Sequence, residues 1–388
     1  MKFKIKGNLI TPNRIIENGE ICFENKKITY VGVQKNDDTL YSVTDYGDKY
    51  ISPGFIDLHI HGGGGYDFMD GTEKAFRGVS SLHAKHGTTT MLATTLTCPD
   101  EELFNIFDVF SKIESRDKTN LYGLHLEGPY FSKNQKGAQD ERFIVLPKKE
   151  HYNSILKKGA NFIKRWSVAP ELDGALALGN ILALREILPS IGHSDADYDT
   201  ALKAFECGYT HLTHFYSGMS TITRVGGFRR LGLVESGYII KDFTVEIIAD
   251  GCHLPPELLK FIYDSKGADK TALVTDALRA AGTNEKTMFI GSPENGYQVI
   301  IEDGVAKLPD RSAFAGSIAT ADRLVRNMIK YTNCGLCDAV KMITQTPAKI
   351  AKIPSKGVLC QGFDADFAVF DSNININSVY IGGERVEE

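Results

Sequence analysis

Long apolar runs are missing from this sequence. No stretch approaches the roughly 18 consecutive apolar residues that a membrane helix needs, and the opening Met-Lys-Phe-Lys-Ile-Lys alternates like a strand, unlike a signal peptide. An excess of basic charge is missing too, since 44 Lys and Arg are outnumbered by 49 Asp and Glu, which argues against nucleic-acid binding. Cysteine is scarce, and an odd number of seven scattered residues argues against a disulfide framework. We therefore expect a cytoplasmic protein with no nucleic-acid or membrane partner.

The 388 residues have an ordinary globular composition, 42% hydrophobic and 24% charged. This length suits one large domain plus a smaller one, or a single elaborated barrel. Both ends of the chain consist of short strand-like pieces punctuated by glycine, such as residues 19–23 and 379–383. We expect residues 1–50 and 355–388 to meet in one small β-sandwich domain.

Between the two ends, in residues 51–354, apolar strand-like runs alternate with helical periods such as that of residues 197–208. The pattern predicts a parallel sheet closed into a (β/α)₈ barrel, with a hairpin inserted at residues 283–311. An open doubly wound sheet is the alternative, but Gly62-Gly63-Gly64-Gly65 after the first strand lacks the GxGxxG spacing typical of that fold. The eight candidate strands are residues 51–61, 89–96, 121–127, 162–169, 190–193, 210–214, 243–249 and 271–276.

Ionisable residues occur where five of these runs stop. In a barrel, the carboxyl ends of the strands form the rim where active sites lie. Imidazoles and carboxylates without thiolates suit zinc or iron with open coordination positions. We therefore predict one metal-binding basin with six members: His59, His61, Glu127, His193, His214 and Asp276.

Each of these residues alone could be a hydrogen-bonded core residue, but six ionisable groups in one basin are costly unless something neutralises them. Three other histidines are interpreted differently. His211 lies three residues before His214 on the same strand, so we expect it to point to the opposite face and not to bind metal. His125 is placed to support a ligand, and His253, after the seventh strand, to contact substrate.

At these motifs the chain resembles the N-acetylglucosamine-6-phosphate deacetylases of the amidohydrolase superfamily. The most specific piece is His125-Leu126-Glu127-Gly128-Pro129, and the motifs run in the family's order from about residue 50 to 320. Most amidohydrolases bridge two metals with a carboxylated lysine after strand four, where this chain has Ala169-Pro170-Glu171, so Glu127 looks like the replacement. The other motifs are Pro53 to Gly62, Gly192-His193-Ser194, Thr213 to Tyr216, Ala249-Asp250-Gly251 with His253, Val274 to Ala277 and Ala315-Gly316-Ser317.

The resemblance implies a divalent metal, zinc or iron, with one or two ions per subunit. Glu127, His193 and His214 would hold the principal ion. His59 and His61 would allow a second ion, bridged by Glu127 with help from Asp276, which also matches the family's catalytic aspartate. The positions that correspond to sugar-phosphate contacts are Ala138, Ser217, Gly218, His253, Phe314, Ala315 and Gly316.

Two departures from the family concern the phosphate. Ser217-Gly218-Met219 stands where the family has Asn-Ala-Met, and the following segment contains Arg224 outside the family's Arg-Glu-Pro-Gly register. The resemblance nevertheless implies hydrolysis of an N-acetylated amino sugar 6-phosphate, most simply N-acetylglucosamine 6-phosphate, by a homodimer in which Arg224 reads the phosphate. The alternatives are a deacetylase of N-acetylgalactosamine 6-phosphate or of an unphosphorylated sugar, and a non-catalytic sugar-phosphate sensor.

Overall fold

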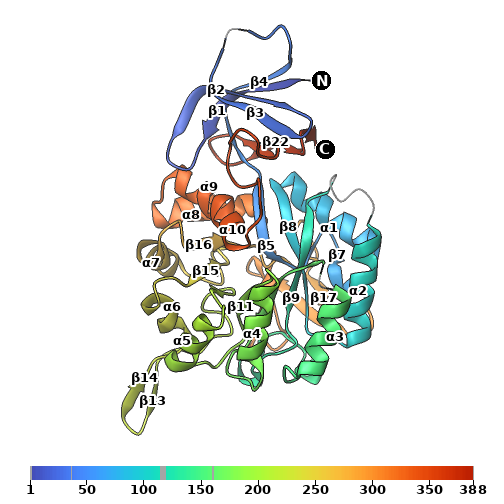
Figure 1. Ribbon diagram of the computed structural model, residues 1–388, viewed down its shortest axis with the longest axis vertical. Helices are drawn as coiled ribbons and strands as arrows, with labels where there is room; N and C mark the ends of the chain where they lie inside the picture. Colours follow the sequence, from blue (N-terminus) through green and yellow to red (C-terminus); the bar gives the residue numbers. More distant parts are fainter. Residues whose placement is uncertain (1, 36, 114–118, 160, 388) are drawn as a thin grey trace.

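The computed structural model describes residues 2–35, 37–113, 119–159 and 161–387. The two ends of the chain lie together at one pole of the molecule (Figure 1) and share one sheet, in the order β23-β22-β21-β4-β1-β2-β3. Its seven strands are β1 (Phe3–Ile10), β2 (Ile15–Glu24), β3 (Lys27–Val33), β4 (Ser42–Pro53), β21 (Phe367–Phe370), β22 (Ile376–Ile381) and β23 (Glu384–Arg385).

The terminal sheet is bent around its own apolar core. The ring of Phe23 on β2 lies 5.5 Å from that of Phe367 on β21, although β1 and β4 separate these two strands in the sheet. Tyr380 on β22 also contacts Phe23. The predicted small β domain built from both ends is thus present, and its sandwich-like core comes from one continuous sheet curled on itself.

The rest of the chain forms the predicted barrel. Eight parallel strands follow one another in chain order, and the backbone N–H of Asp276, just beyond β16, donates to the carbonyl of His59 on β5 at 2.9 Å, so the last strand meets the first. An open doubly wound sheet would have a reversal in strand order, so that alternative is excluded. The strands are β5 (Phe55–Ile60), β8 (Thr88–Thr95), β9 (Leu121–Glu127), β10 (Ile163–Val168), β11 (Leu188–Ile191), β12 (His211–Leu212), β15 (Thr244–Ile247) and β16 (Thr271–Leu273).

Helices surround this barrel (Figure 1), and the side chains that they bury are mostly apolar, as in α1 and α2. In α5, for example, the side chain of Asp197 caps the first turn by accepting from the N–H of Thr200, and Ala201 and Ala204 are buried. Among the described residues, no helix combines the length and the apolar character needed to cross a membrane. The α-helices are α1 (Glu73–Lys85), α2 (Asp100–Lys112), α3 (Lys149–Gly159), α4 (Ala175–Leu184), α5 (Tyr198–Glu206), α6 (Leu233–Ile239), α7 (Pro256–Lys266), α8 (Ala321–Thr332), α9 (Leu336–Ile343) and α10 (Gln345–Ile350).

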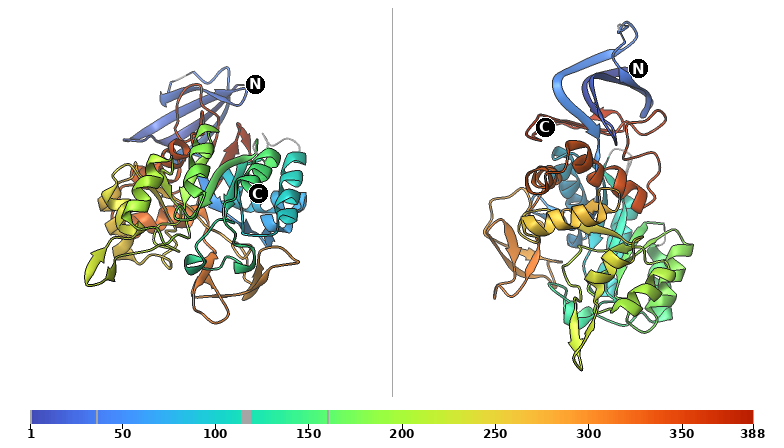
Figure 2. Two further views of the ribbon diagram at one scale, coloured as in Figure 1. Left: turned by 60° about the horizontal axis from the view of Figure 1, so that its bottom comes forward. Right: turned by 90° about the vertical axis from the view of Figure 1, so that its left-hand side faces the viewer.

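Two additions lie on the barrel's loops. The segment after β16, predicted as a hairpin, is larger: four antiparallel strands in the order β17-β18-β19-β20. A second, smaller hairpin, β13–β14, projects from the body on the side away from the terminal sheet (Figure 2). The strands are β17 (Thr287–Ile290), β18 (Tyr297–Glu302), β19 (Val305–Lys307), β20 (Phe314–Ser317), β13 (Thr223–Val225) and β14 (Phe228–Arg230). The remaining short elements of the described residues are β6 (Gly62–Gly63), β7 (Tyr66–Asp67) and the 3₁₀ turns η1 (Phe68–Asp70), η3 (Lys133–Gln135) and η4 (Glu141–Phe143).

The two sheets meet at one end of the barrel only. β4 leads into β5 through the single residue Gly54, and a cleft between the sheets is lined by Thr89 and Leu121, near the starts of β8 and β9. The terminal sheet therefore lies beside the amino ends of the barrel strands. The carboxyl ends, where the predicted site residues are, face the loops at the opposite end.

Candidate metal centre and active site

A cavity of about 240 Å³ opens at the carboxyl end of the barrel. Five of the six predicted metal-site residues line it, and the sixth, His59, lies directly beneath, with its Nε2 3.2 Å from Nε2 of His61. Glu127 ends β9, whereas His61, His193, His214 and Asp276 follow the last residues of β5, β11, β12 and β16 by one to three positions. Parallel strands that end at one rim therefore bring together residues that are far apart in sequence, up to the 217 positions between His59 and Asp276.

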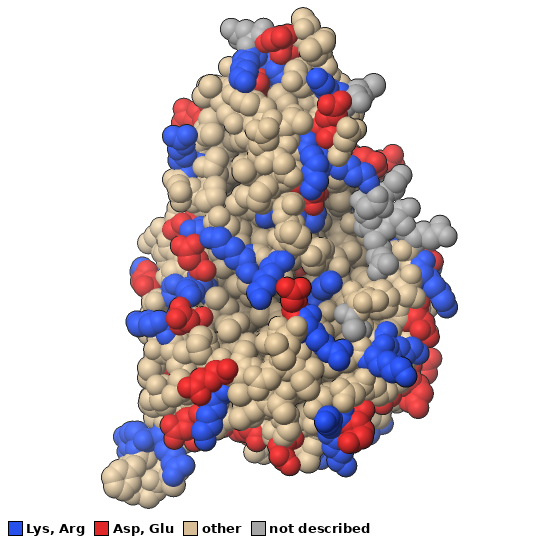
Figure 3. Space-filling model, in the orientation of Figure 1, with Lys and Arg blue, Asp and Glu red and all other residues tan. Residues whose placement is uncertain are grey.

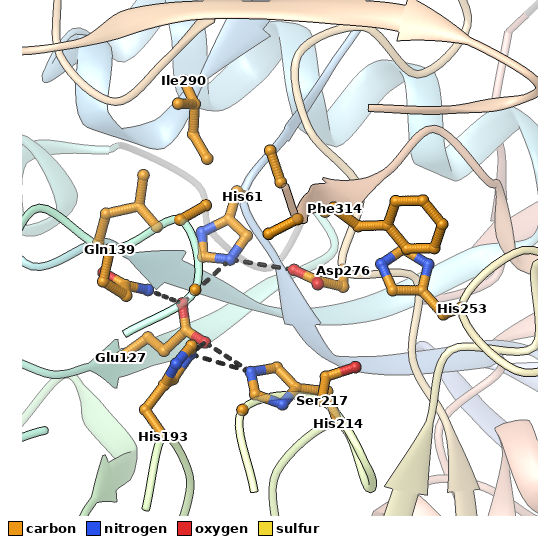
Figure 4. Close-up of a pocket in the computed structure, with 17 residues that line it drawn as sticks. His61, Glu127, Gln139, His193, His214, Ser217, His253, Asp276, Ile290 and Phe314 are labelled. Atoms are coloured by element: carbon orange, nitrogen blue, oxygen red, sulfur yellow. Dashed lines mark hydrogen bonds and ion pairs between the residues drawn. The ribbon is translucent and has the colours of Figure 1, made fainter. Parts of the chain in front are cut away.

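The carboxylate of Glu127 occupies the centre of this cluster (Figure 4). Its Oε1 lies 3.1 Å from Nε2 of His193, 3.1 Å from Nε2 of His214 and 3.5 Å from Nε2 of His59. Its Oε2 lies 3.4 Å from Nε2 of His61. One carboxylate thus lies beside four imidazoles that come from the ends of three barrel strands, β5, β11 and β12, which is the arrangement expected of a ligand shared between two sites.

The six residues form two sets with metal-ligand spacing. In each set the ligand atoms lie within 4.8 Å of one another, and every member is buried. The first set is Glu127, His193 and His214, and the second is His59, His61 and Asp276. Asp276 Oδ1 is 3.2 Å from Nε2 of His61 and 3.5 Å from Nε2 of His59, so this carboxylate, which follows β16, completes the second set.

The hydrogen bonds behind two of the rings test whether a cation fits here. Nδ1 of His59 faces the carboxylate of Glu246 at 2.9 Å, and Nδ1 of His193 faces the carbonyl of Gln135 at 2.8 Å. Carboxylate and carbonyl oxygens only accept, so Nδ1 carries the proton in both rings, and a neutral ring then directs the lone pair of Nε2 into the cluster. Nε2 of His193 and Nε2 of His214 are only 3.1 Å apart beside Glu127. Several acceptors that converge in a buried space fit a divalent cation.

The electrostatics of the cluster agree with that fit. Burial disfavours the charged ring of His59, but the carboxylates of Glu127 and Asp276 outweigh it and raise its pKa to about 9. For His61 burial is likewise outweighed, by hydrogen bonds to Asp276 and Glu127, and its pKa rises to about 10. Burial alone would raise the pKa of Glu127, yet the histidines around it hold that pKa well below its usual value. The site therefore retains positive charge, as protons when no metal is bound, and metal binding would release those protons.

Three of the six residues have left-handed backbones, which non-glycine residues seldom adopt. The φ angles are 49° at His193, 27° at His214 and 46° at Asp276. Such conformations cost of order 1–3 kcal/mol each and cluster at functional sites. The main chain turns sharply as it leaves these strands, and this turn directs the side chains into the cavity.

The walls of the cavity contain most of the predicted substrate contacts. Ala138, Ser217, Gly218, His253, Phe314, Ala315 and Gly316 all line it. Arg224 does not: it lies exposed on the projecting β13–β14 hairpin. The inserted sheet supplies one wall, because Ile290 ends β17 and Phe314 begins β20, and the ring of Phe314 packs 5.0 Å from that of His253.

Gln139, which the sequence argument missed, also lines the cavity. Its side-chain amide donates to Oε2 of Glu127 at 2.6 Å, and its own carbonyl accepts from the N–H of Thr97 at 2.9 Å. It thus fixes the orientation of the central carboxylate. Nothing in the local sequence Gly137-Ala138-Gln139 distinguishes it from a polar loop residue.

Two charged residues inside barrel strands, Arg165 on β10 and Glu246 on β15, were missed as well, although Glu246 is the one charge in its strand and a charge within a buried strand is a usable signal. Glu246 also corrects the expectation for His211. That ring does not point away from the barrel interior: its Nε2 is 3.1 Å from Oε2 of Glu246, the same carboxylate that contacts His59. β12 ends at Leu212, so strand alternation does not extend to His214. His125 packs against His59 and hydrogen-bonds Ser167 at 2.7 Å, outside the cavity.

Comparisons with known proteins give a consistent result. The amidohydrolase family model matches residues 50–386. The chain is 34% identical over 345 residues to an N-acetylglucosamine-6-phosphate deacetylase of Lysinibacillus sphaericus, covering 86% of this chain and 85% of the relative. It is 31% identical to that of Bacillus subtilis strain 168, covering 95% and 92%. A variant of the Mycobacterium smegmatis enzyme, solved in complex with N-acetyl-D-glucosamine 6-phosphate, matches all of both chains with a TM-score of 0.91 and 26% identity.

Proposed function

The chain belongs to the amidohydrolase family, among its N-acetylglucosamine-6-phosphate deacetylases, and from this premise we propose that it hydrolyses the N-acetyl group of N-acetyl-D-glucosamine 6-phosphate. The products are acetate and D-glucosamine 6-phosphate. The observation that carries the proposal is the carboxylate of Glu127, which joins two sets of metal ligands at the floor of a cavity. A sugar-phosphate sensor would have no need of such a centre.

In this proposal Glu127, His193 and His214 hold the principal ion, zinc or iron, and His59, His61 and Asp276 a second one. A bound divalent ion polarises the amide carbonyl and lowers the pKa of water from 15.7 to about 7. Gln139 keeps the central carboxylate oriented by its hydrogen bond to Oε2 of Glu127.

Asp276 is the proposed general base and acid. It lies at the cavity surface opposite Glu127, and the histidines beside it hold the pKa of its carboxyl below the usual value in spite of burial, so it is ionised and able to accept a proton. It takes that proton from the water that attacks the acetyl carbon. It returns a proton to the sugar nitrogen as the C–N bond breaks, so the amine leaves neutral.

Recognition of the phosphate requires a second subunit in this proposal. Among the described residues that line the cavity there is no lysine or arginine, so the chain itself offers His253 and the backbone N–H of Gly218, while the N–H of Ser217 donates to the carbonyl of His214 at 2.9 Å. Nδ1 of His253 donates to Asp250 at 2.8 Å, which orients the ring beside Phe314. A phosphomonoester with nearly two negative charges usually meets arginine as well.

The β13–β14 hairpin can supply that arginine. Arg224 and Arg229 are directly opposite each other across the two strands, so their side chains share one face, and Arg230 pairs with Thr223 on the other face. Like charges in such a pair repel unless an anion lies between them. Gly226 and Gly227 have positive φ angles of 55° and 87°, as a tight two-residue turn requires. The hairpin stands clear of its own subunit, with basic side chains around an uncharged tip (Figure 3), and we propose that it reaches the cavity of a partner in a homodimer.

A cytoplasmic location also belongs to the proposal. Its support is that all seven cysteines, each within the described part of the chain, are free thiols.

The direct test is acetate release from a panel of N-acetylglucosamine and N-acetylgalactosamine, each with and without a 6-phosphate. We expect the highest kcat/KM for N-acetylglucosamine 6-phosphate. Preference for the galactosamine epimer, or equal rates with and without phosphate, would identify a deacetylase of another amino sugar. Binding of the sugar phosphate without acetate release from any member would identify a sensor.

The hairpin is tested with paired variants. Arg224→Ala with Arg229→Ala should raise KM for the phosphorylated sugar about ten- to hundredfold, the range of one charge-assisted contact, and leave the unphosphorylated sugar unaffected. Arg230→Ala, on the other face, is the matched control. Mixing the double variant with Asp276→Asn should restore activity, because a mixed dimer has one site with an intact aspartate and a partner's arginines. No restoration would contradict recognition by the partner's hairpin.

A further inference from the structure

The interior of the barrel beneath the metal centre contains an ion pair that the proposed reaction does not use. Arg165 on β10 and Glu246 on β15 are both completely buried, and Nη1 of Arg165 donates to Oε2 of Glu246. An ion pair with no water contact is seldom a net source of stability, because desolvation costs as much as the attraction returns. The pair therefore calls for a role other than holding the fold together.

The carboxylate of Glu246 accepts hydrogen bonds on both oxygens. Oε1 takes Nδ1–H of the His59 ring at 2.9 Å and the backbone N–H of His214 at 2.9 Å. Oε2 takes Nε2–H of His211 at 3.1 Å in addition to Arg165. Oε1 thus contacts one residue from each of the two proposed ligand sets, His59 and His214. Oε2 contacts His211 and Arg165, which belong to neither set.

Arg165 fixes the direction of the hydrogen bonds around Glu246, so that Glu246 accepts and His59 donates. Its guanidinium donates to the carbonyl of Leu58 at 3.1 Å and to the hydroxyls of Ser190 and Thr213 at 3.0 and 2.9 Å. Arginine has no acceptor atom and keeps its charge in proteins, so the oxygen that faces it must accept. The other oxygen is then directed at His59, whose Nδ1 must donate. A neutral His59 ring is left with its lone pair on Nε2, the atom 3.5 Å from Glu127 and from Asp276.

We propose that Glu246 is a positioning residue for the second metal: it fixes His59 with the proton on Nδ1 and the lone pair of Nε2 directed at the ion, and Arg165 holds Glu246 in place for this. The inference rests on the proposed role of His59 as a metal ligand. It goes beyond that role because it assigns the tautomer and orientation of His59 to a carboxylate that is itself neither a proposed metal ligand nor a residue lining the substrate cavity. Partners of this kind behind a metal-bound histidine typically affect metal affinity 10- to 100-fold.

The decisive variant is Glu246→Gln, which preserves shape and removes one acceptor. Arg165 and His211 donate toward one end of this side chain and the backbone N–H of His214 toward the other. The charged guanidinium is the stronger donor, so we expect the glutamine oxygen to face it and the NH₂ to face Nδ1 of His59. His59 then has to accept on Nδ1, which places its proton on Nε2, where the ion would bind. We expect affinity for the second zinc ion to fall 10- to 100-fold, and the principal ion, held by Glu127, His193 and His214, to remain.

Glu20→Gln is the matched control. Glu20 is also a fully buried carboxylate paired with a buried cation, Lys4 at 3.1 Å, but it lies in the terminal sheet on β2. Both variants lose a buried charge and some stability. Only Glu246→Gln should lose zinc, which is measured by equilibrium dialysis against buffered free zinc with elemental analysis. Equal loss of zinc in both variants would show a merely structural effect and overturn the inference.

Wild-type protein supplies the answer if Glu246→Gln fails to fold. In the zinc-loaded enzyme, long-range ¹⁵N–¹H spectra should show His59 protonated at Nδ1 with a downfield, slowly exchanging proton, assigned by its absence in His59→Asn. A proton on Nε2, or a rapidly exchanging Nδ1–H, overturns the inference. Two zinc ions bound with unchanged affinity in Glu246→Gln overturn it too, while leaving the deacetylase proposal intact. A wild-type protein that binds no second zinc contradicts the ligand role of His59 and the inference together, whereas absence of acetate release contradicts the proposed function alone.

Discussion

Replacement of Asp276 by asparagine separates proton transfer from metal binding. The substitution preserves size and removes the proton acceptor. The backbone at this position is held independently of the side chain, because its N–H donates to His59 and its carbonyl accepts from the N–H of Ser317, each at 2.9 Å. The strained backbone, with φ of 46°, also suits asparagine, which tolerates the left-handed region better than most residues. We therefore expect the variant to fold.

The magnitude follows from the role. General acid–base assistance is typically worth 10²- to 10⁴-fold, so kcat should fall by that factor, which corresponds to about 3–5 kcal/mol of barrier. The principal ion should remain at about one equivalent, because none of its three proposed ligands is changed. The second ion should bind more weakly, because the amide lacks the charge that Asp276 directs at His61 from 3.2 Å.

The assay is steady-state acetate release from N-acetylglucosamine 6-phosphate, with metal content measured on the same preparation. Asp57→Asn is the control. Asp57 is buried nearby and accepts from the hydroxyl of Thr275, but it does not line the cavity, so its loss should lower stability and leave kcat within about tenfold. If Asp276→Asn retains kcat within tenfold of wild type with its principal ion in place, the proton acceptor is another group and the proposed mechanism is wrong.

Three further predictions concern the metals and the fold. Alanine at any ligand of the principal ion should yield protein without that ion and without activity, and full metal content by elemental analysis in the variants of Glu127, His193 and His214 would contradict the assignment. His59→Asn combined with His61→Asn should remove about one equivalent of metal and part of the activity, whereas unchanged stoichiometry would favour a single-ion site. Burial lowers the pKa of His83 from 6.5 to about 4. As the pH falls, this histidine is therefore protonated in the unfolded chain before it is protonated in the folded protein. About 3 kcal/mol of the free energy of unfolding present above pH 6.5 should then be lost as the pH falls to 4. His83→Gln, which can still donate to the carbonyl of Gly62, should flatten this loss in thermal denaturation, and an unchanged pH dependence would exclude His83 as its cause.

The site could be predicted where simple strand geometry governs it. His59 and His61 are two residues apart on and just after β5, and alternation alone places both rings on one side, as their 3.2 Å Nε2 separation confirms. The same rule failed for His211, because β12 is only two residues long and the backbone of His214 has turned to a φ of 27°. Left-handed backbone conformations beyond strand ends depend on tertiary contacts, and no local sequence pattern predicts them.

The inserted sheet was only half predicted for a related reason. Asp303-Gly304 is a strong turn signal, and it does join β18 to β19. Two of the four residues of β17 are exposed, and β20 is the short segment Phe314–Ser317, whose glycine and small residues carry little strand propensity. Their pairing depends on the neighbouring strands. Phe314, Ala315 and Gly316, which the resemblance marked as substrate contacts, line the cavity from within β20.

One signal in the sequence could have decided between the closed barrel and the open sheet. Strands buried on both faces are normally apolar, so Arg165, which is buried on β10 beside the partly exposed Lys164, and Glu246, the one charge on β15, need partners of opposite charge. In the sheet order, β12 and β11 separate β15, which carries Glu246, from β10, which carries Arg165, so in a flat sheet these two strands would lie about 14 Å apart. A direct contact between their side chains requires the sheet to curve around a common axis. The two buried charges therefore pair only in a barrel, and the same curvature that joins them places Glu246 directly beneath His59.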